Sequence, residues 1–120
     1  MARELRRTAG MDTPLQITYR GFEHTPDLDA FVRDQAASLE PAAGNRLTSC
    51  HVVIELDHQQ HHSRVFHAHI DVTVPGGTIA VNREPQDQSP HQDAFVAVSD
   101  AFDAARRQII DWEHRHHGQG

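Results

Sequence analysis

The side chains with the widest chemical repertoire in this chain are its 11 histidines. Imidazole binds Zn²⁺ where three or four ligands converge, and it gains its proton at about pH 6.5. His51, His67 and His69 lie in segments that alternate apolar and polar residues, so they can share one sheet face with carboxylates. Their spacing matches no zinc motif, and histidine–carboxylate pairs also form as ordinary cross-strand pairs. We therefore expect no metal and no cofactor, with zinc at these three histidines as the alternative.

Motifs for catalysis are absent from the sequence. It has no glycine-rich phosphate loop, no His-Glu-x-x-His pair and no serine in a nucleophile elbow. The single cysteine, Cys50, falls on the inward side of an expected strand, where a thiol acts as a small apolar side chain. One cysteine also excludes an intramolecular disulfide, which fits a reducing cytoplasm. We expect a binding protein and not an enzyme.

The cations of the chain are all arginines. Its 120 residues include 11 of them against 17 Asp plus Glu, and the formal net charge is −6 with histidine neutral. Charging every histidine would change this to −6 + 11 = +5. An acidic average argues against indiscriminate nucleic-acid binding, because neutralisation of phosphates drives that association. No segment has the roughly 20 apolar residues that a membrane-spanning helix needs, so we expect a soluble, cytoplasmic protein.

Alternating strands and striped helices must position these side chains. Thr25 is expected to cap a first helix that Pro41 ends, and Ser89-Pro90 to start a second one. The second helix carries apolar residues at gaps of three and four, namely Phe95, Val98, Phe102, Ala105, Ile109 and Trp112. The expected strands are residues 15–20, 50–57, 66–74 and 78–83.

The order of these elements predicts an α+β domain with the order β-α-β-β-β-α. Its four-stranded mixed sheet would carry both helices on one face. The first two strands can be parallel because a helix joins them, and the others form an antiparallel meander. We expect residues 1–13 to be a disordered extension, 14–113 the domain and 114–120 a flexible His-rich tail.

Several landmarks occur in a characteristic order over residues 14–113. They are Arg20-Gly21 with Thr25-Pro26, Cys50-His51-Val52-Val53, Val74-Pro75-Gly76-Gly77-Thr78-Ile79-Ala80-Val81, Asp93-Ala94-Phe95-Val96-Ala97-Val98 and Arg107-Gln108. The ordered set resembles the family of ribosome hibernation-promoting factors and ribosome-associated inhibitors, also called sigma-factor modulation or subunit-interface proteins. This chain looks like a divergent short form.

The resemblance implies a fold similar to double-stranded RNA-binding domains and a stress-responsive regulator of translation. Such a protein binds the small ribosomal subunit and its ribosomal RNA and occludes the mRNA–tRNA channel, with no catalytic step and no membrane. The sequence leaves open whether the protein also forms a weak homodimer. Family members use Lys and Arg on the outer helix faces, whereas Gln35 and Ser38 stand at two such places here. The RNA-binding residues that the resemblance implies are Arg20, Arg33, Arg83, Arg106, Arg107 and Arg115.

Two alternatives remain open from the sequence. Arg106 and Arg107 could instead be charges near a helix end that favour the helix dipole. The whole fold could also be diverted to a protein- or metal-binding role through its acidic, His-rich sheet face. The distribution of charge separates these functions, because arginines gathered on the helical side with acids on the sheet side would favour RNA.

Overall fold

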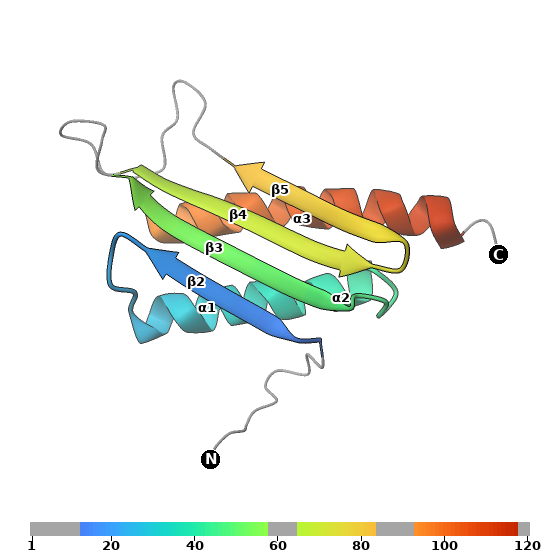
Figure 1. The fold of residues 1–120 in the computed structure, drawn as a ribbon, viewed down its shortest axis with the longest axis horizontal. Helices are drawn as coiled ribbons and strands as arrows, with labels where there is room; N and C mark the ends of the chain where they lie inside the picture. The colour runs from blue at the N-terminus through green and yellow to red at the C-terminus, as the bar shows by residue number, and fades with distance from the viewer. Residues whose placement is uncertain (1–12, 58–64, 84–92, 118–120) are drawn as a thin grey trace, which may run out of the picture.

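The computed structural model describes residues 13–57, 65–83 and 93–117. Within them, the strands are β2 (Leu15–Arg20), β3 (Ser49–Asp57), β4 (Val65–Val74) and β5 (Gly77–Arg83). The helices are α1 (Pro26–Ala37), α2 (Leu39–Ala42) and α3 (Ala94–His117). The sheet has the order β2-β3-β4-β5, with β2 and β3 parallel and the other pairs antiparallel. Figure 1 shows α1 and α3 on the same side of the sheet, so the expected α+β fold is confirmed.

The hydrophobic core lies between the helices and the inward face of the sheet. Along β3 every second residue is buried, and Val52 and Ile54 are fully inaccessible. They pack in one cluster with Val32 of α1 and with Phe102 and Ile109 of α3. Because side chains alternate along a strand, the intervening polar residues of β3 and β4 lie on the opposite, open face of the sheet.

Helix α1 begins as the sequence predicts and ends earlier. Thr25 Oγ1 accepts a hydrogen bond from the Leu28 amide at 3.1 Å, which caps the helix, and Pro26 is its first residue. The expectation that Pro41 ends the helix is wrong, because α1 ends at Ala37 and Pro41 lies within the short α2. Pro41 is the third residue of α2, where a helix has no acceptor for a backbone N–H in any case.

Both ends of the expected domain differ from the prediction. Thr13, assigned to the extension, is buried and its hydroxyl donates to the Leu47 carbonyl at 3.3 Å. The expected start of the second helix at Ser89-Pro90 lies outside the described residues. Helix α3 continues to His117 instead of ending before residue 114. The His116 ring stacks on Trp112, with centroids 4.8 Å apart, which extends packing into this last turn.

One strand-to-helix turn depends on glycine, and we predict that Gly21→Ala destabilises the protein by about 1–3 kcal/mol. Gly21 has φ +84°, and an added Cβ would lie 2.6 Å from the Leu56 carbonyl oxygen. Urea unfolding measures the loss. The matched control is Gly77→Ala, since Gly77 has ordinary φ and no atom within 4 Å of its Cβ position. Equal stability of the two variants would contradict the prediction.

No helix in the described part of the chain is long and apolar enough to cross a membrane.

Candidate functional site

The arginine on α1 pairs with a carboxylate one turn before it. Arg33 Nε donates to Asp29 Oδ2 at 2.7 Å, and the Tyr19 hydroxyl donates to Asp29 Oδ1 at 3.0 Å. Partial burial raises the pKa of Asp29, but the hydrogen bonds from Arg33 and Tyr19 outweigh it and bring this pKa below its ordinary value. The carboxylate is therefore charged at neutral pH, and a phosphate would have to compete with it for Arg33.

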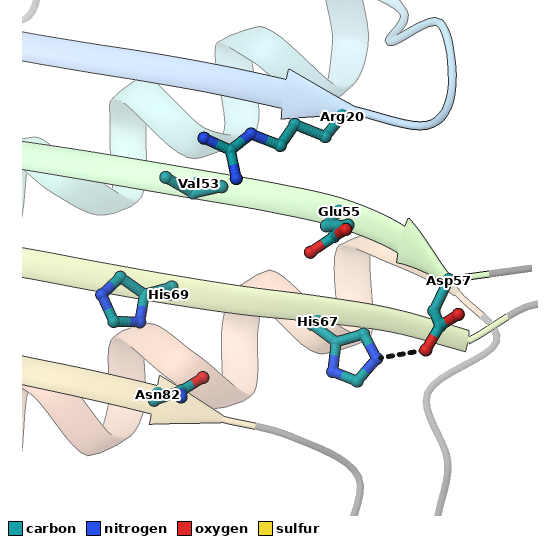
Figure 2. A pocket seen from close by; sticks show the side chains of 7 residues that line it. All are labelled: Arg20, Val53, Glu55, Asp57, His67, His69 and Asn82. Atoms are coloured by element: carbon teal, nitrogen blue, oxygen red, sulfur yellow. Dashed lines mark ion pairs between the residues drawn. The ribbon is translucent and has the colours of Figure 1, made fainter. Parts of the chain in front are cut away.

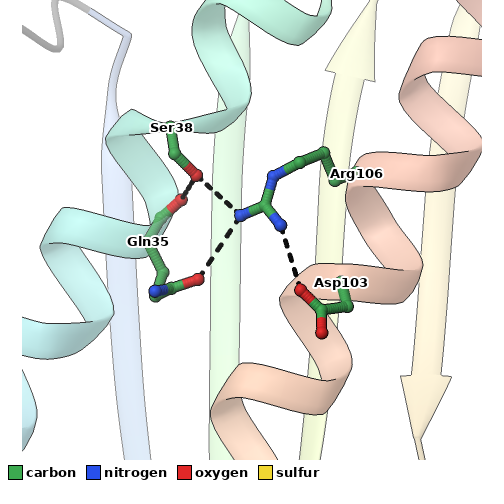
Figure 3. A network of polar contacts seen from close by, with 4 residues as sticks. All are labelled: Gln35, Ser38, Asp103 and Arg106. Carbon is green, nitrogen blue, oxygen red and sulfur yellow. Dashed lines mark hydrogen bonds and ion pairs between the residues drawn. The ribbon is translucent and has the colours of Figure 1, made fainter.

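Arg106 connects the two long helices (Figure 3). Its Nη2 reaches from α3 to the end of α1, where Gln35 Oε1 accepts at 3.4 Å and the hydroxyl of Ser38, the residue that follows the helix, accepts at 2.8 Å. Its Nη1 donates to Asp103 Oδ1 at 3.1 Å on its own helix. With α3 ending at His117, Arg106 is not in the last turn, so its interpretation as a helix-end charge is wrong. Its guanidinium therefore lies at Gln35 and Ser38, the two positions where the family resemblance implies Lys or Arg.

The other predicted arginines are spread over the molecule. Arg107 is exposed on α3 and makes no ion pair with the residues that the structure describes, whereas Arg115 Nη1 pairs with Asp111 Oδ2 at 2.9 Å. Arg20 lies on the open sheet face, opposite Glu55 in the register. Arg83 ends β5. The six predicted residues therefore do not form one patch.

Arg46 is a cation that the sequence did not single out. It forms an ion pair with Glu113 of α3, and its guanidinium carbon lies 4.7 Å from the centre of the Trp112 ring. The loop that holds it turns through Gly44 and Asn45, both at φ 62°. No local motif predicts this contact, because its partners are 67 residues apart in the chain.

The open sheet face carries a shallow hollow of about 460 Å³ (Figure 2). All four strands contribute to it. The residues that line it are Arg20, Val53, Glu55, Asp57, His67, His69 and Asn82. In Figure 2 the Arg20 side chain comes from β2, the two imidazoles from β4 and the carboxylates from β3. Donors and acceptors therefore alternate across this hollow.

The histidines of the open face contact different partners. The predicted register is confirmed, since His51 lies opposite Asp71 and Glu55 opposite His67. His51 Nε2 lies 3.2 Å from a threonine hydroxyl on β2, whereas His69 Nε2 lies 3.3 Å from Asp71 Oδ1. His67 Nε2 lies 3.5 Å from a carboxylate oxygen at the end of β3.

The zinc alternative at His51, His67 and His69 finds no support in this arrangement. Among residues 13–57, 65–83 and 93–117, no group of three or more His, Cys, Asp or Glu side chains could hold a metal ion. The three imidazoles contact three different partners, so their nitrogen atoms do not converge on one point.

Negative charge lies on both faces of the domain. Among the residues that the structure describes, the charges of the open face sum to +1 − 3 = −2 with histidine neutral, counting Arg20 against Glu55, Asp57 and Asp71. On the helical side, Arg33, Arg106 and Arg115 each pair with a neighbouring Asp. The arginines are thus not segregated from the acids, and the charge distribution alone does not favour RNA.

We predict that Cys50 is unreactive in the folded protein. Burial raises the pKa of its thiol to about 12, and the charges of Asp71 and Glu40 add to the rise. At pH 8 its thiolate fraction, and hence its rate with Ellman's reagent, should be on the order of 10³ lower than in the unfolded chain. Because folding raises this pKa, the protonated thiol contributes stability below the unfolded pKa of about 9. This contribution is lost as pH rises toward 12. Rapid labelling of the native protein would contradict the buried placement.

Three comparisons with known proteins bear on the identity of the chain. A family model described as Sigma 54 modulation protein / S30EA ribosomal protein matches residues 15–117. Among solved structures, the chain is similar to the N-terminal domain of Protein Y from Thermus thermophilus, with TM-score 0.64 and 24% identity. It is also similar to a ribosomal subunit interface protein from Coxiella burnetii, with TM-score 0.65 and 16% identity. Each match covers 85% of this chain and 99% of the other. No curated protein matches the chain.

Proposed function

Because the chain belongs to the Sigma 54 modulation protein / S30EA ribosomal protein family, we propose that it binds the small ribosomal subunit and occludes the mRNA–tRNA channel. The family is one of ribosome-associated hibernation and interface factors, which are not enzymes. The observation that carries the proposal is the family match over residues 15–117, nearly the whole described domain. In this proposal the protein acts in the cytoplasm of stressed cells.

The helical side is the surface that we assign to ribosomal RNA. Arg106 supports this assignment, since it brings a guanidinium to Gln35 and Ser38, where the family resemblance implies Lys or Arg. A charge missing from α1 is thus supplied from α3. Arg107 is exposed next to it in the sequence and can approach a second phosphate. Arginine suits this role because its planar fork of donors matches phosphate oxygens.

Occlusion requires a rigid body and no reacting group. Helix α3 has 24 residues, which corresponds to a length of about 36 Å. Its buried stripe fixes it to the sheet through Phe102 and Ile109. A domain of this kind excludes mRNA and tRNA by occupying their volume, and inhibition ends when it dissociates.

Binding in this proposal is sensitive to salt and pH. A phosphate must replace a carboxylate at each paired arginine, and the net charge of −6 opposes approach to RNA. Protonation of histidines below about pH 6.5 makes the chain less negative. We therefore expect the tightest binding at low salt and mildly acidic pH.

Cosedimentation with ribosomes across a salt and pH series tests the proposal. The chain should pellet with small subunits at low salt near pH 6. Small subunits that already carry mRNA and tRNA should bind less of it. Absence from the ribosomal fractions under every condition would reject the function. If the same amount of the chain pellets with and without bound mRNA and tRNA, the occlusion mechanism is rejected, whereas ribosome association still holds.

The second candidate is the same fold diverted to protein binding through the open sheet face. The hollow lined by residues of all four strands favours it. Glu55→Gln together with His67→Gln alters this hollow and leaves the helical side and every arginine unchanged. If the ribosomal proposal holds, this double variant pellets like the parent chain.

A further inference from the structure

The open sheet face leaves two opposite charges without partners. Arg20 of β2 and Glu55 of β3 lie opposite each other in the parallel register, yet they form no ion pair. Neither side chain makes a hydrogen bond or an ion pair with the residues that the structure describes. In Figure 2 the Arg20 side chain runs back along the sheet toward Val53, apart from the Glu55 carboxylate. The hollow on this face therefore offers a free guanidinium and a free carboxylate at the same time.

The middle of this hollow is apolar. Val53 is the single apolar side chain among the described residues that line it. Val53 lies opposite Thr18 on β2 and His69 on β4, and Glu55 follows it on the same face of β3. An apolar floor inside a border of hydrogen-bonding groups suits a flat ring that stacks on the floor and bonds through its edges. The volume of about 460 Å³ lies within the range of about 300–1,000 Å³ that is typical of small-molecule sites.

The two free charges select the ring by its hydrogen-bonding groups. A carboxylate accepts two parallel hydrogen bonds from adjacent donors, and a guanidinium donates two to adjacent acceptors. Guanine carries both sets, since N1–H and the N2 amino group are adjacent donors, and O6 and N7 are adjacent acceptors. Adenine and cytosine each offer one amino group and uracil one ring N–H, so none of them presents two adjacent donors to a carboxylate. Guanine is therefore the base that this pair of side chains fits.

The remaining groups of the hollow favour an uncharged ligand. Arg20 is the only arginine among the described lining residues, and the guanine ring engages it. The imidazoles of His67 and His69 already lie beside carboxylate oxygens, at 3.5 and 3.3 Å. The described part of the hollow thus offers a phosphate no free cation, and its carboxylates oppose one. A nucleoside fits better than a nucleotide.

We propose that this hollow binds the guanine base of a free nucleoside. Glu55 accepts hydrogen bonds from N1–H and the N2 amino group, Arg20 donates to O6 and N7, and the ring lies on Val53. His69 and Asn82 stand at the border of the hollow, where they can meet the ribose hydroxyls. The helices cover the opposite side of the sheet, so this site goes beyond the proposed function and does not depend on ribosome binding.

Titration of the isotope-labelled full chain with nucleosides, followed by NMR, tests the site. Guanosine should shift the amide signals of Val53 and Glu55 in a saturable way. Inosine lacks the N2 amino group and should bind about tenfold more weakly, because one charge-assisted hydrogen bond is lost. The guanosine analogue with carbon in place of N7 should lose a similar factor through Arg20. Adenosine should cause no saturable shift.

A conservative substitution connects the specificity to one side chain. Glu55→Gln keeps the shape but replaces one acceptor by a donor, so it should weaken guanosine binding about tenfold and remove most of the difference between guanosine and inosine. The matched control is Glu23→Gln, an exposed carboxylate outside the hollow, which should bind like the parent chain. The spectrum of each variant shows that it is folded.

Four outcomes would overturn the inference. They are no saturable shift with guanosine, equal binding of guanosine and adenosine, a Glu55→Gln variant that binds guanosine like the parent chain, and tighter binding of guanosine monophosphate than of guanosine. The last outcome would show that a phosphate contact, and not the base, determines binding. Ribosome pelleting is a separate measurement, so failure of the proposed function leaves this test unchanged.

Discussion

Charge reversal of four helical arginines should lower the affinity for ribosomes by on the order of 10³ at low salt. Each phosphate contact contributes about 1 kcal/mol, and four such losses multiply to that factor. The substitutions are Arg33→Glu, Arg106→Glu, Arg107→Glu and Arg115→Glu. Dissociation constants measured across a salt series also test the mechanism, since losing ionic contacts makes the dependence of log K on log salt less steep.

The same argument predicts tighter binding when the competing carboxylates are neutralised. Asp29→Asn, Asp103→Asn and Asp111→Asn release Arg33, Arg106 and Arg115 from their ion pairs, so a triple Asn variant should bind ribosomes more tightly. The control is Glu55→Gln, which changes charge on the open sheet face and should have little effect. Unchanged affinity after both the arginine and the aspartate substitutions would show that the helical side is not the RNA surface.

The architecture was predictable because its signals are local. Thr25 and Pro26 lie at a helix start, and the alternation along β3 and β4 sets which side chains face the core. The pairing of His51 with Asp71 follows from that alternation and from one intervening turn. Each of these features depends on residues close together in the chain, and each is found in the structure.

The site was less predictable because its contacts join distant segments. Arg106 and Ser38 are 68 positions apart in the chain. Predicting their contact requires the distance between two packed helices, and the periodicity of the sequence does not give that distance. The stripe of α3 likewise predicts that Phe95 faces the core, but Phe95 lies in the first turn of the helix, where its ring packs beside Phe31 and stays 39% exposed. The apolar stripe therefore predicts burial correctly in the middle of this helix but not for Phe95 in its first turn.

The ion pairs explain how an acidic chain could bind RNA selectively. A phosphate that binds one of the paired arginines must displace Asp29, Asp103 or Asp111 from it. The net free energy of binding nonspecific RNA is therefore small. Only a surface that also offers cations to those displaced carboxylates compensates for the exchange. A ribosome provides such cations on its basic proteins, and free RNA does not.

Phe102→Ala should cause the largest loss of stability, about 3–5 kcal/mol. Phe102 is fully buried, and it is the largest side chain among the fully inaccessible described residues. Truncation removes its transfer free energy and leaves a cavity between α3 and the sheet, where packed neighbours cannot close in. Because domains of this size are stable by only about 5–15 kcal/mol, urea unfolding should show a large fall in the midpoint.

The matched control for Phe102→Ala is Phe95→Ala on the same helix. Phe95 is 39% exposed, so its truncation should destabilise the protein by less than about 1.5 kcal/mol. Both variants retain every helical arginine. Phe102→Ala should therefore lose ribosome binding only where it unfolds, whereas the charge-reversal variant loses binding while it stays folded. Similar midpoints for the two phenylalanine variants would contradict the placement of α3 on the sheet, and with it the position assigned to Arg106.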